Sequence, residues 1–193
     1  MKERIEYKLT RDVTVGQLQT WMDENTDHSK TEIVKLIRHR FENRYLKHIK
    51  CVDSGFLIMA VSCFVIETLQ SFREGEPDTN GKGERMFKNF FKNEQDNFSG
   101  FNEKISIEFY KHIRCGILHQ SETTNAWRVL RVGKLLDETE FSINAEMFLE
   151  SLNKSVSKYL DELAHSDFNS ELWKNAFIKL KDICENCKRK TTV

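Results

Sequence analysis

The chain has 193 residues, which suits one domain with a substantial hydrophobic core. Thirty basic and thirty acidic side chains cancel, so no overall charge favours nucleic acid or a membrane surface, and a nucleic-acid site would need local clustering. One proline and eight glycines, with 31% charged residues, indicate long helices with few interruptions.

Two features bear on the location of the protein. Residues 1–12 are charged throughout, so we expect no signal peptide there. The most apolar stretch, 55–72, is interrupted by polar residues, and its unbroken part is about half of the ~20 residues that cross a bilayer. We interpret it as a buried helix of a soluble protein. Five cysteines, an odd number, fit a reducing compartment, so we predict a cytoplasmic protein without a membrane segment.

Apolar residues at helical spacing mark the first half of the chain. They predict a weak helix over 12–25, a stronger one over 29–49 with Ser29 as its N-cap, and a buried helix over 52–73. The only proline and three glycines fall in 73–84, which predicts a surface loop. A short aromatic helix over 84–93 and a second loop over 93–100 follow.

The second half of the chain mixes two patterns. A helix from about 102 to 117 is followed by alternating residues around Gly133, which predict a small β-hairpin at about 126–143. Helical spacing returns over 147–163 and 170–187. We therefore predict one mainly α domain over 1–193: a helical bundle with a core at about 29–165, a loop at 73–84, the β insertion, and a C-terminal helix at about 170–187.

The sequence CENC ends the last predicted helix with Cys184 and Cys187. A structural zinc site needs four ligands, and the other cysteines are single residues in other elements. A redox Cys-x-x-Cys pair usually opens a helix after a strand, whereas this pair closes one. The sequence alone favours two cysteines without a function, and we expect no metal and no cofactor.

The stretch FYKHIRCGILHQSE, 109–122, carries the candidate chemistry. Lys111 and Arg114 are three residues apart on one flank of the expected helix, so both can approach one anion. Gly116 allows another backbone to come close. His119 is five residues after Arg114, about 140° around a regular helix, so the two converge only if the helix ends near Leu118 or if two copies meet across a two-fold axis.

RNA cleavage without metal suits such a pair. Arg114, which is always charged, can bind the scissile phosphate through a planar fork of N–H groups. His119 can exchange a proton with the 2′-hydroxyl or with the leaving 5′-oxygen, because imidazole titrates near neutral pH. RNA supplies its own nucleophile, so no serine, cysteine or bound metal is required.

The segment Arg114-Cys115-Gly116-Ile117-Leu118-His119 resembles the Arg-x(4–6)-His motif of the HEPN superfamily, the "higher eukaryotes and prokaryotes nucleotide-binding" helical domains. The layout of residues 30–165 is similar too, although only the motif is specific. The resemblance implies a helical bundle, dimers with the motif at the interface, and often metal-independent endoribonuclease activity in toxin–antitoxin systems or phage defence. The residue after the arginine is commonly polar in the family, and here it is Cys115.

Other residues could support this site. Glu67 lies inside the most apolar helix and must be paired, protonated or turned toward a cavity. We favour a core ion pair or hydrogen bond with a basic residue such as Arg44, and the alternative places Glu67 behind Arg114 as an orienting partner. The segment 104–134 contains six basic residues and only two acidic ones, which indicates a local positive patch.

Within this patch Trp127 could stack on an unpaired base, with Arg128 and Arg131 beside it as RNA contacts. For the two arginines a solvated position on the hairpin is the favoured interpretation. We predict a HEPN-like homodimer that binds RNA and acts as a metal-independent endoribonuclease, with an antitoxin or other protein as a further partner. The alternatives are a non-catalytic HEPN-like module that binds a nucleotide, RNA or protein, and a plain helical scaffold.

Overall fold

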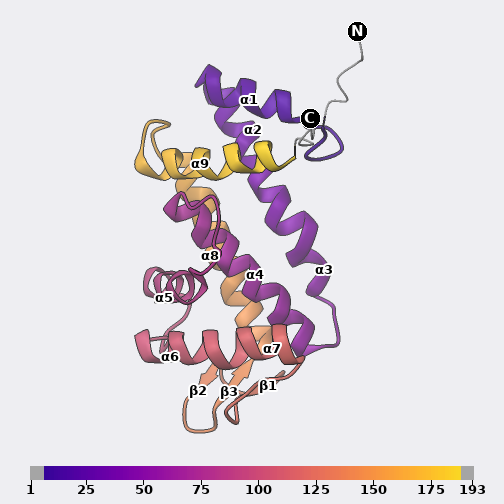
Figure 1. Cartoon of the computed structure of the whole chain (residues 1–193), viewed down its shortest axis with the longest axis vertical. Helices are drawn as coiled ribbons and strands as arrows, with labels where there is room; N and C mark the ends of the chain where they lie inside the picture. Colours follow the sequence, from indigo (N-terminus) through magenta and orange to yellow (C-terminus); the bar gives the residue numbers. More distant parts are fainter. Residues whose placement is uncertain (1–6, 188–193) are drawn as a thin grey trace, which may run out of the picture.

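The computed structural model describes residues 7–187, and it is mainly helical with one small sheet (Figure 1). Half of residues 1–12, on which the signal-peptide argument rests, lie outside this range. The helices are α1 (Val15–Glu24), α2 (Asp27–Arg38), α3 (Lys47–Ile49), α4 (Gly55–Glu74), α5 (Gly83–Asn93), α6 (Glu103–Glu108), α7 (Cys115–Gln120), α8 (Ala145–His165) and α9 (Glu171–Asn186). Two π-helical segments, η1 (His39–Leu46) and η2 (Phe109–Arg114), join α2 to α3 and α6 to α7.

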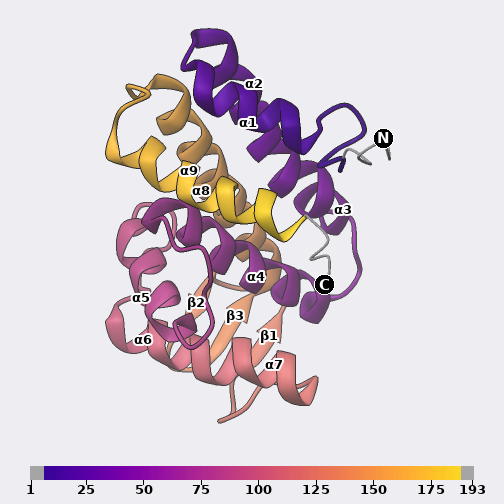
Figure 2. The ribbon, with the colours of Figure 1, turned by 45° about the horizontal axis from the view of Figure 1, so that its top comes forward.

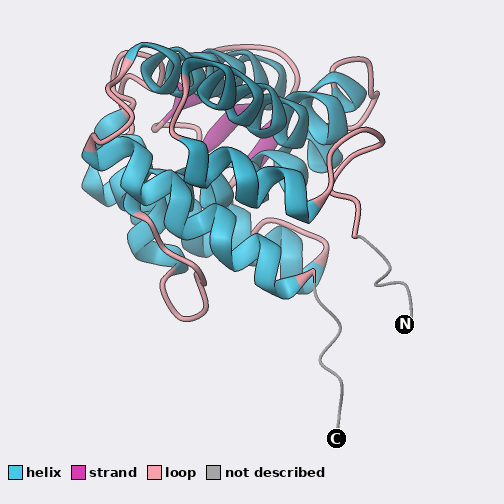
Figure 3. Ribbon diagram, turned by 90° about the horizontal axis from the view of Figure 1, so that it is seen from above, coloured by secondary structure: helices cyan, strands magenta, loops and turns pink. Residues whose placement is uncertain are grey.

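The predicted fold class, mainly α with a small β insertion, is confirmed, and Figure 3 shows how little strand the described chain contains. The insertion is not a simple hairpin. Strands β1 (Arg128–Leu130), β2 (Leu136–Asp137) and β3 (Ser142–Asn144) form a sheet in the order β1-β3-β2. β3 pairs in parallel with β1 and antiparallel with β2, so the chain forms the edge strand β2 before it returns to the middle of the sheet.

Helix α4 is the centre of the bundle. Ser54 caps its first turn, Gly75 ends it with a left-handed backbone (φ 64°), and most of its apolar side chains are buried. Figure 1 shows α4 and α8 running through the middle of the molecule, with α1 and α9 toward one end and α6, α7 and the sheet at the other. Figure 2 shows the sheet beside α6 and α7.

Helix α4 is also long and apolar enough to cross a membrane by length and composition, but 61% of its apolar window is buried inside the fold. Such burial is consistent with the core helix of a soluble protein, as predicted. One buried cluster of apolar side chains runs from Leu9 to Cys184. It therefore includes side chains of α1 and α9 and extends beyond the predicted core at about 29–165.

The continuous helix over α2, η1 and α3 matches the stripe predicted over 29–49, but its cap differs. Thr26 is the N-cap and accepts a hydrogen bond from the backbone N–H of Ser29. Ser29 is fully buried, and its hydroxyl donates to Glu24 at 2.9 Å. Both residues are good caps by type, so the sequence pattern did not distinguish them.

A cluster of phenylalanine rings holds the motif-bearing helix against α5 and α8. Its rings are fully or almost fully buried, with neighbouring centroids 4.4–6.4 Å apart. Phe109, at the start of η2, stacks on Phe148 of α8 with centroids 5.2 Å apart. Buried aromatic pairs of this kind fix the rotation of the helix about its axis. The cluster consists of Phe87, Phe90, Phe91, Phe98, Phe101, Phe109 and Phe148.

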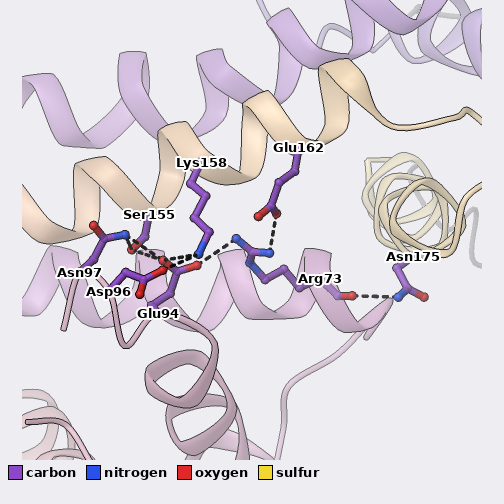
Figure 4. Close-up of polar contacts among 8 residues, drawn as sticks. All are labelled: Arg73, Glu94, Asp96, Asn97, Ser155, Lys158, Glu162 and Asn175. Carbon is purple, nitrogen blue, oxygen red and sulfur yellow. Dashed lines mark hydrogen bonds and ion pairs between the residues drawn. The ribbon is translucent and has the colours of Figure 1, made fainter. Parts of the chain in front are cut away.

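A buried ionic network joins α4, the turn after α5, and α8 (Figure 4). Arg73 donates to Glu94 at 3.0 Å and to Glu162 at 2.8 Å. The side chain of Glu94 is 0% exposed, and it also accepts hydrogen bonds from Asn97 at 3.0 Å and Ser155 at 2.8 Å. A carboxylate at this depth is tolerated because its oxygens are satisfied and a cation compensates its charge.

Candidate functional site

The motif lies on one continuous helix that contains a π-helical segment. Asn102 caps α6, and η2 widens the helix over Phe109–Arg114, where the N–H of Cys115 bonds to the carbonyl of Tyr110, five residues back. Single π turns inside α-helices are frequent at functional sites. The helix continues to Gln120 and ends at Ser121 with φ 55°. His119 is therefore still helical, so a helix end before it, one of the two ways in which Arg114 and His119 could converge, is not what the structure has.

Arg114 is held from two sides. Its Nη2 atom donates to Oε2 of Glu67 at 3.0 Å, and its guanidinium lies over the ring of Tyr110, 5.5 Å from the centroid. The side chain keeps 20% of its surface exposed. Burial lowers the pKa of Arg114, but the charge and hydrogen bond of Glu67 outweigh it and place that pKa above its ordinary value. Arg114 is thus a fixed cation with one exposed side.

Glu67 contacts Arg114 rather than the predicted partner. Its other oxygen, Oε1, accepts a hydrogen bond from the hydroxyl of Thr79 at 2.7 Å, and Arg44 instead donates to the backbone carbonyl of Leu9. The preference for an ion pair with Arg44 was wrong, because Arg44 turns toward the N-terminal segment. The structure matches the geometry of the alternative, in which Glu67 lies behind Arg114.

His119 and Lys111 are both exposed. Within residues 7–187 the His119 side chain makes no hydrogen bond or ion pair, and none joins it to the Arg114 side chain. The π turns end at Arg114, so ordinary helix separates the two side chains and they diverge by about 140°. The Nζ of Lys111 lies 3.9 Å from Glu84 on α5, with 55% of the side chain exposed. One copy of the chain does not assemble Arg114, His119 and Lys111 into one cluster.

Gly116 permits the close backbone approach that its position suggested. The chain turns back after Ser121, and a Cβ atom on Gly116 would lie 2.6 Å from the carbonyl oxygen of Glu122. The N–H of Thr124 donates to the carbonyl of His112 at 3.0 Å, and the two side chains are joined by a 2.8 Å hydrogen bond. The loop after the motif is therefore docked directly on the motif helix.

Gly116→Ala is expected to lower the free energy of unfolding by about 1–3 kcal/mol, because the new methyl group overpacks against backbone that cannot move freely. Thermal and urea unfolding followed by circular dichroism measure this loss. Gln120→Ala, at an exposed site of the same helix, is the matched control with a small expected effect. Equal stability of the two variants would show that the loop is not docked as described.

The predicted RNA-binding residues lie in the β insertion. Trp127 is 3% exposed and packs edge-on against Phe141, so its ring cannot stack on a base, and the expectation for Trp127 is corrected. Arg128 donates to Glu140 at 2.8 Å, and Arg131 pairs with Asp53 and Glu146. These two arginines are exposed and ion-paired, which agrees with the solvated positions favoured from the sequence. Their contacts with RNA stay a prediction.

Sequence reasoning missed two residues of this site. Tyr110 precedes Arg114 by four residues, and that spacing was a usable signal, because residues four apart are neighbours on a helix. Thr79 lies in the loop between α4 and α5, 35 positions before Arg114, and no local pattern links it to Glu67. Within residues 7–187 no three His, Cys, Asp or Glu side chains gather in a way that could hold a metal ion.

Comparison with known proteins does not assign the chain to a family. No protein-family model matches the chain, and no curated protein or solved structure matches it.

Proposed function

We propose that the chain is a metal-independent endoribonuclease of the HEPN type, located in the cytoplasm. The observation that carries the proposal is the setting of Arg114, a half-buried cation held by Glu67 and Tyr110 on the same helix as the exposed His119. The motif resemblance extends the proposal to a toxin or phage-defence role, with an antitoxin or other protein as partner.

In this proposal Arg114 binds the scissile phosphate. A guanidinium carries five N–H donors, and Glu67 takes one hydrogen bond from Nη2, so donors remain for an anion on the exposed side. His119 exchanges protons while the 2′-oxygen forms a bond to phosphorus and the bond from phosphorus to the 5′-oxygen breaks. The proton leaves the 2′-hydroxyl and one is delivered to the 5′-oxygen. Lys111 adds positive charge nearby.

The site requires a second copy of the chain, because one copy separates Arg114 from His119. Leu118 is 57% exposed one turn after Arg114, and Phe64 is 39% exposed one turn before Glu67. Tyr45 packs on Phe64 with ring centroids 4.6 Å apart and is itself 40% exposed. These apolar side chains beside the motif would be covered in a homodimer that brings the two motifs together.

The chain is therefore expected to run as a dimer of twice 22.8 kDa in size-exclusion chromatography with light scattering at micromolar concentration. Leu118→Asp should give a monomer, because it places a charge in the proposed interface. Val132→Asp, at a 75% exposed apolar residue of the β insertion, is the matched control and should stay dimeric. A wild-type monomer would remove the composite site and leave the fold untouched.

A second candidate function is a non-catalytic module that binds a nucleotide, RNA or a protein through the same surface. The intramolecular contacts of Arg114 favour it, since the guanidinium already has a carboxylate and a ring as partners without any second copy. In such a module Arg114 would bind an anion and His119 would carry no chemistry. A His119 variant therefore distinguishes the two functions, because only the nuclease needs its imidazole.

His119→Ala is expected to lower the rate of RNA cleavage by about 10²–10⁴-fold, the usual effect of losing one general acid–base group. The assay uses purified protein and mixed cellular RNA in EDTA, and the dimer and thermal stability should be unchanged because the side chain has no partner among residues 7–187. His28→Ala, another exposed histidine on α2, should cleave at the wild-type rate. If wild-type protein binds RNA in this assay and does not cleave it, the binding module stands.

A further inference from the structure

The positive charges of the segment 104–134 are largely compensated in the structure. Carboxylates pair with Arg114, Arg128 and Arg131 at 2.6–3.0 Å, and the Nζ of Lys134 lies 3.6 Å from Asp137. A surface that binds a polyanion needs positive charge that the protein has not already neutralised. This segment therefore offers a nucleic acid less charge than its sequence suggests.

Uncompensated charge lies instead near the N-terminal half of the bundle. Among residues 7–187 the side chains of Arg11, Arg40 and Arg44 form no ion pair with a carboxylate. Every other arginine in this range has a carboxylate oxygen at 3.0 Å or less, although the whole chain carries equal numbers of acidic and basic side chains. The paired arginines are Arg38, Arg73, Arg85, Arg114, Arg128 and Arg131.

The three arginines without a carboxylate lie together. Arg40 and Arg44 are four residues apart on η1, about one turn of the helix, and both are half-buried. Arg44 donates to the backbone carbonyl of Leu9, and Arg11 follows Leu9 by two residues. The Arg40 side chain makes no hydrogen bond or ion pair with any residue between 7 and 187. Burial lowers the pKa of Arg40, and the like charge of Arg44 lowers it further.

Exposed lysines continue this charge along α3 and its C-cap. Lys47 and Lys50 are three residues apart, and their side chains make no hydrogen bond or ion pair within the described part of the chain. Between 40 and 50 the only acidic residue is Glu42, which pairs with Arg38 at 2.7 Å. We call the five cations the basic surface, which consists of Arg11, Arg40, Arg44, Lys47 and Lys50.

We propose that the basic surface binds backbone phosphates of the RNA strand whose scissile phosphate lies at Arg114. The identity of the strand as RNA rests on the proposed function, whereas the charge does not. A half-buried guanidinium without a carboxylate is costly unless an anion compensates it, and its fork of N–H donors matches a phosphate group. Cations repeated along one helix fit a strand of phosphates better than a single small anion.

The basic surface borders the motif side of the bundle. Tyr45 directly follows Arg44 and packs on Phe64, with ring centroids 4.6 Å apart. Phe64 lies one turn before Glu67, which holds Arg114. Tyr45 and Phe64 belong to the proposed dimer interface, so the cations lie at the edge of that interface. A strand that enters the cleavage site of the dimer can contact them there.

The test measures, by fluorescence anisotropy at several salt concentrations, the binding of a single-stranded RNA with 2′-O-methyl sugars, which the proposed chemistry cannot cleave. Lys47→Gln with Lys50→Gln should weaken binding about 10- to 30-fold near ~0.1 M salt. The slope of log K against log salt concentration should become shallower by ~1.4, because each phosphate contact of a single strand contributes ~0.7. Both lysines are exposed and unbonded, so the fold should be unchanged.

The matched control removes the same charge elsewhere. Lys92→Gln with Lys154→Gln changes exposed lysines on α5 and α8, and it should leave the affinity and the slope unchanged. Figures 1 and 2 show α5 on the opposite side of α4 from α3. A difference between the two double variants therefore reports where the strand binds and not the net charge of the protein.

Arg40→Gln tests the half-buried part of the surface. It should weaken binding of the same strand about 5-fold, the effect of one lost phosphate contact near ~0.1 M salt. Thermal unfolding should occur at the same temperature or higher, because the substitution removes a half-buried charge that has no partner among residues 7–187. A purely structural role of Arg40 would lower the unfolding temperature and leave binding unchanged.

Three results would overturn the proposal. Wild-type protein could fail to bind the strand, or the Lys47 and Lys50 double variant could bind it as tightly as the control. The lysines could also be needed for binding to phosphatidylserine vesicles and not for binding to RNA. The nuclease fails separately: unmodified RNA that binds through the basic surface and stays uncleaved removes the nuclease and leaves this inference standing. Cleaved RNA whose binding ignores these cations does the reverse.

Discussion

Arg114→Ala is expected to lower the rate of RNA cleavage by at least ~100-fold and to weaken RNA binding as well. The substitution removes the proposed charge-assisted contact to the phosphate. It also removes the partner of Glu67, whose side chain is only 15% exposed, so a loss of stability of about 1–3 kcal/mol is expected alongside. Cleavage and binding are measured separately, by gel assay under single-turnover conditions and by fluorescence anisotropy.

Two control variants separate chemistry from folding. Arg114→Lys keeps the charge and the pair with Glu67, but it loses the planar fork, so stability should recover more than cleavage does. Glu67→Gln keeps the size of the side chain and its hydrogen bond from Thr79, and it should shift the cleavage rate less than Arg114→Ala does. If Arg114→Ala cleaves RNA at the wild-type rate, Arg114 is a structural residue.

Arg73→Met is expected to cost about 3–5 kcal/mol of unfolding free energy. The reason is Glu94, whose side chain is 0% exposed and would lose its only cation within 3.5 Å among the described residues. The hydrogen bonds from Asn97 and Ser155 would remain, but they do not compensate a full negative charge. Urea denaturation followed by circular dichroism measures the loss.

The double variant Arg73→Met with Glu94→Gln tests the cause. Removing the buried charge together with its partner should recover part of the stability, giving a coupling energy of more than ~1 kcal/mol. Lys158→Met is the matched control, because its Nζ lies 4.0 Å from Glu94 and 38% of the side chain is exposed, so its effect should stay below ~1 kcal/mol. Additive effects of the two substitutions would contradict the account of the network.

Most of the helices could be predicted from the sequence because their apolar stripes are complete, while the helix over 12–25 has a weaker stripe. The β insertion could be located but not its topology, since strands of two or three residues carry too few alternations to fix pairing. Trp127, beside Arg128, was expected to be open to an unpaired base, yet it is 3% exposed and packs against the partly exposed Phe141. Short segments do not say which of their faces is buried.

The sequence contains a pattern that could have predicted the π-helical segment η2. The apolar row Ile105, Phe109, Ile113 and Ile117, buried except for the partly buried Ile117, repeats every four residues, and such a row drifts by about 40° per step around a regular α-helix. Wider π turns take up this drift and keep the row against the core. The sequence could not decide whether Glu67 pairs with Arg44 or with Arg114. Only the packing of η2 on α4 selects Arg114.

The central claim is that this chain cleaves RNA through the 2′-hydroxyl without a metal, and the ends of the products test it most directly. Wild-type dimer is incubated with RNA in EDTA, and the new termini are identified by mass spectrometry. The proposal predicts 2′,3′-cyclic phosphate and 5′-hydroxyl ends, with no cleavage at positions that carry a 2′-deoxy sugar. Products with 3′-hydroxyl and 5′-phosphate ends, or cleavage that stops in EDTA and returns with magnesium, would contradict it.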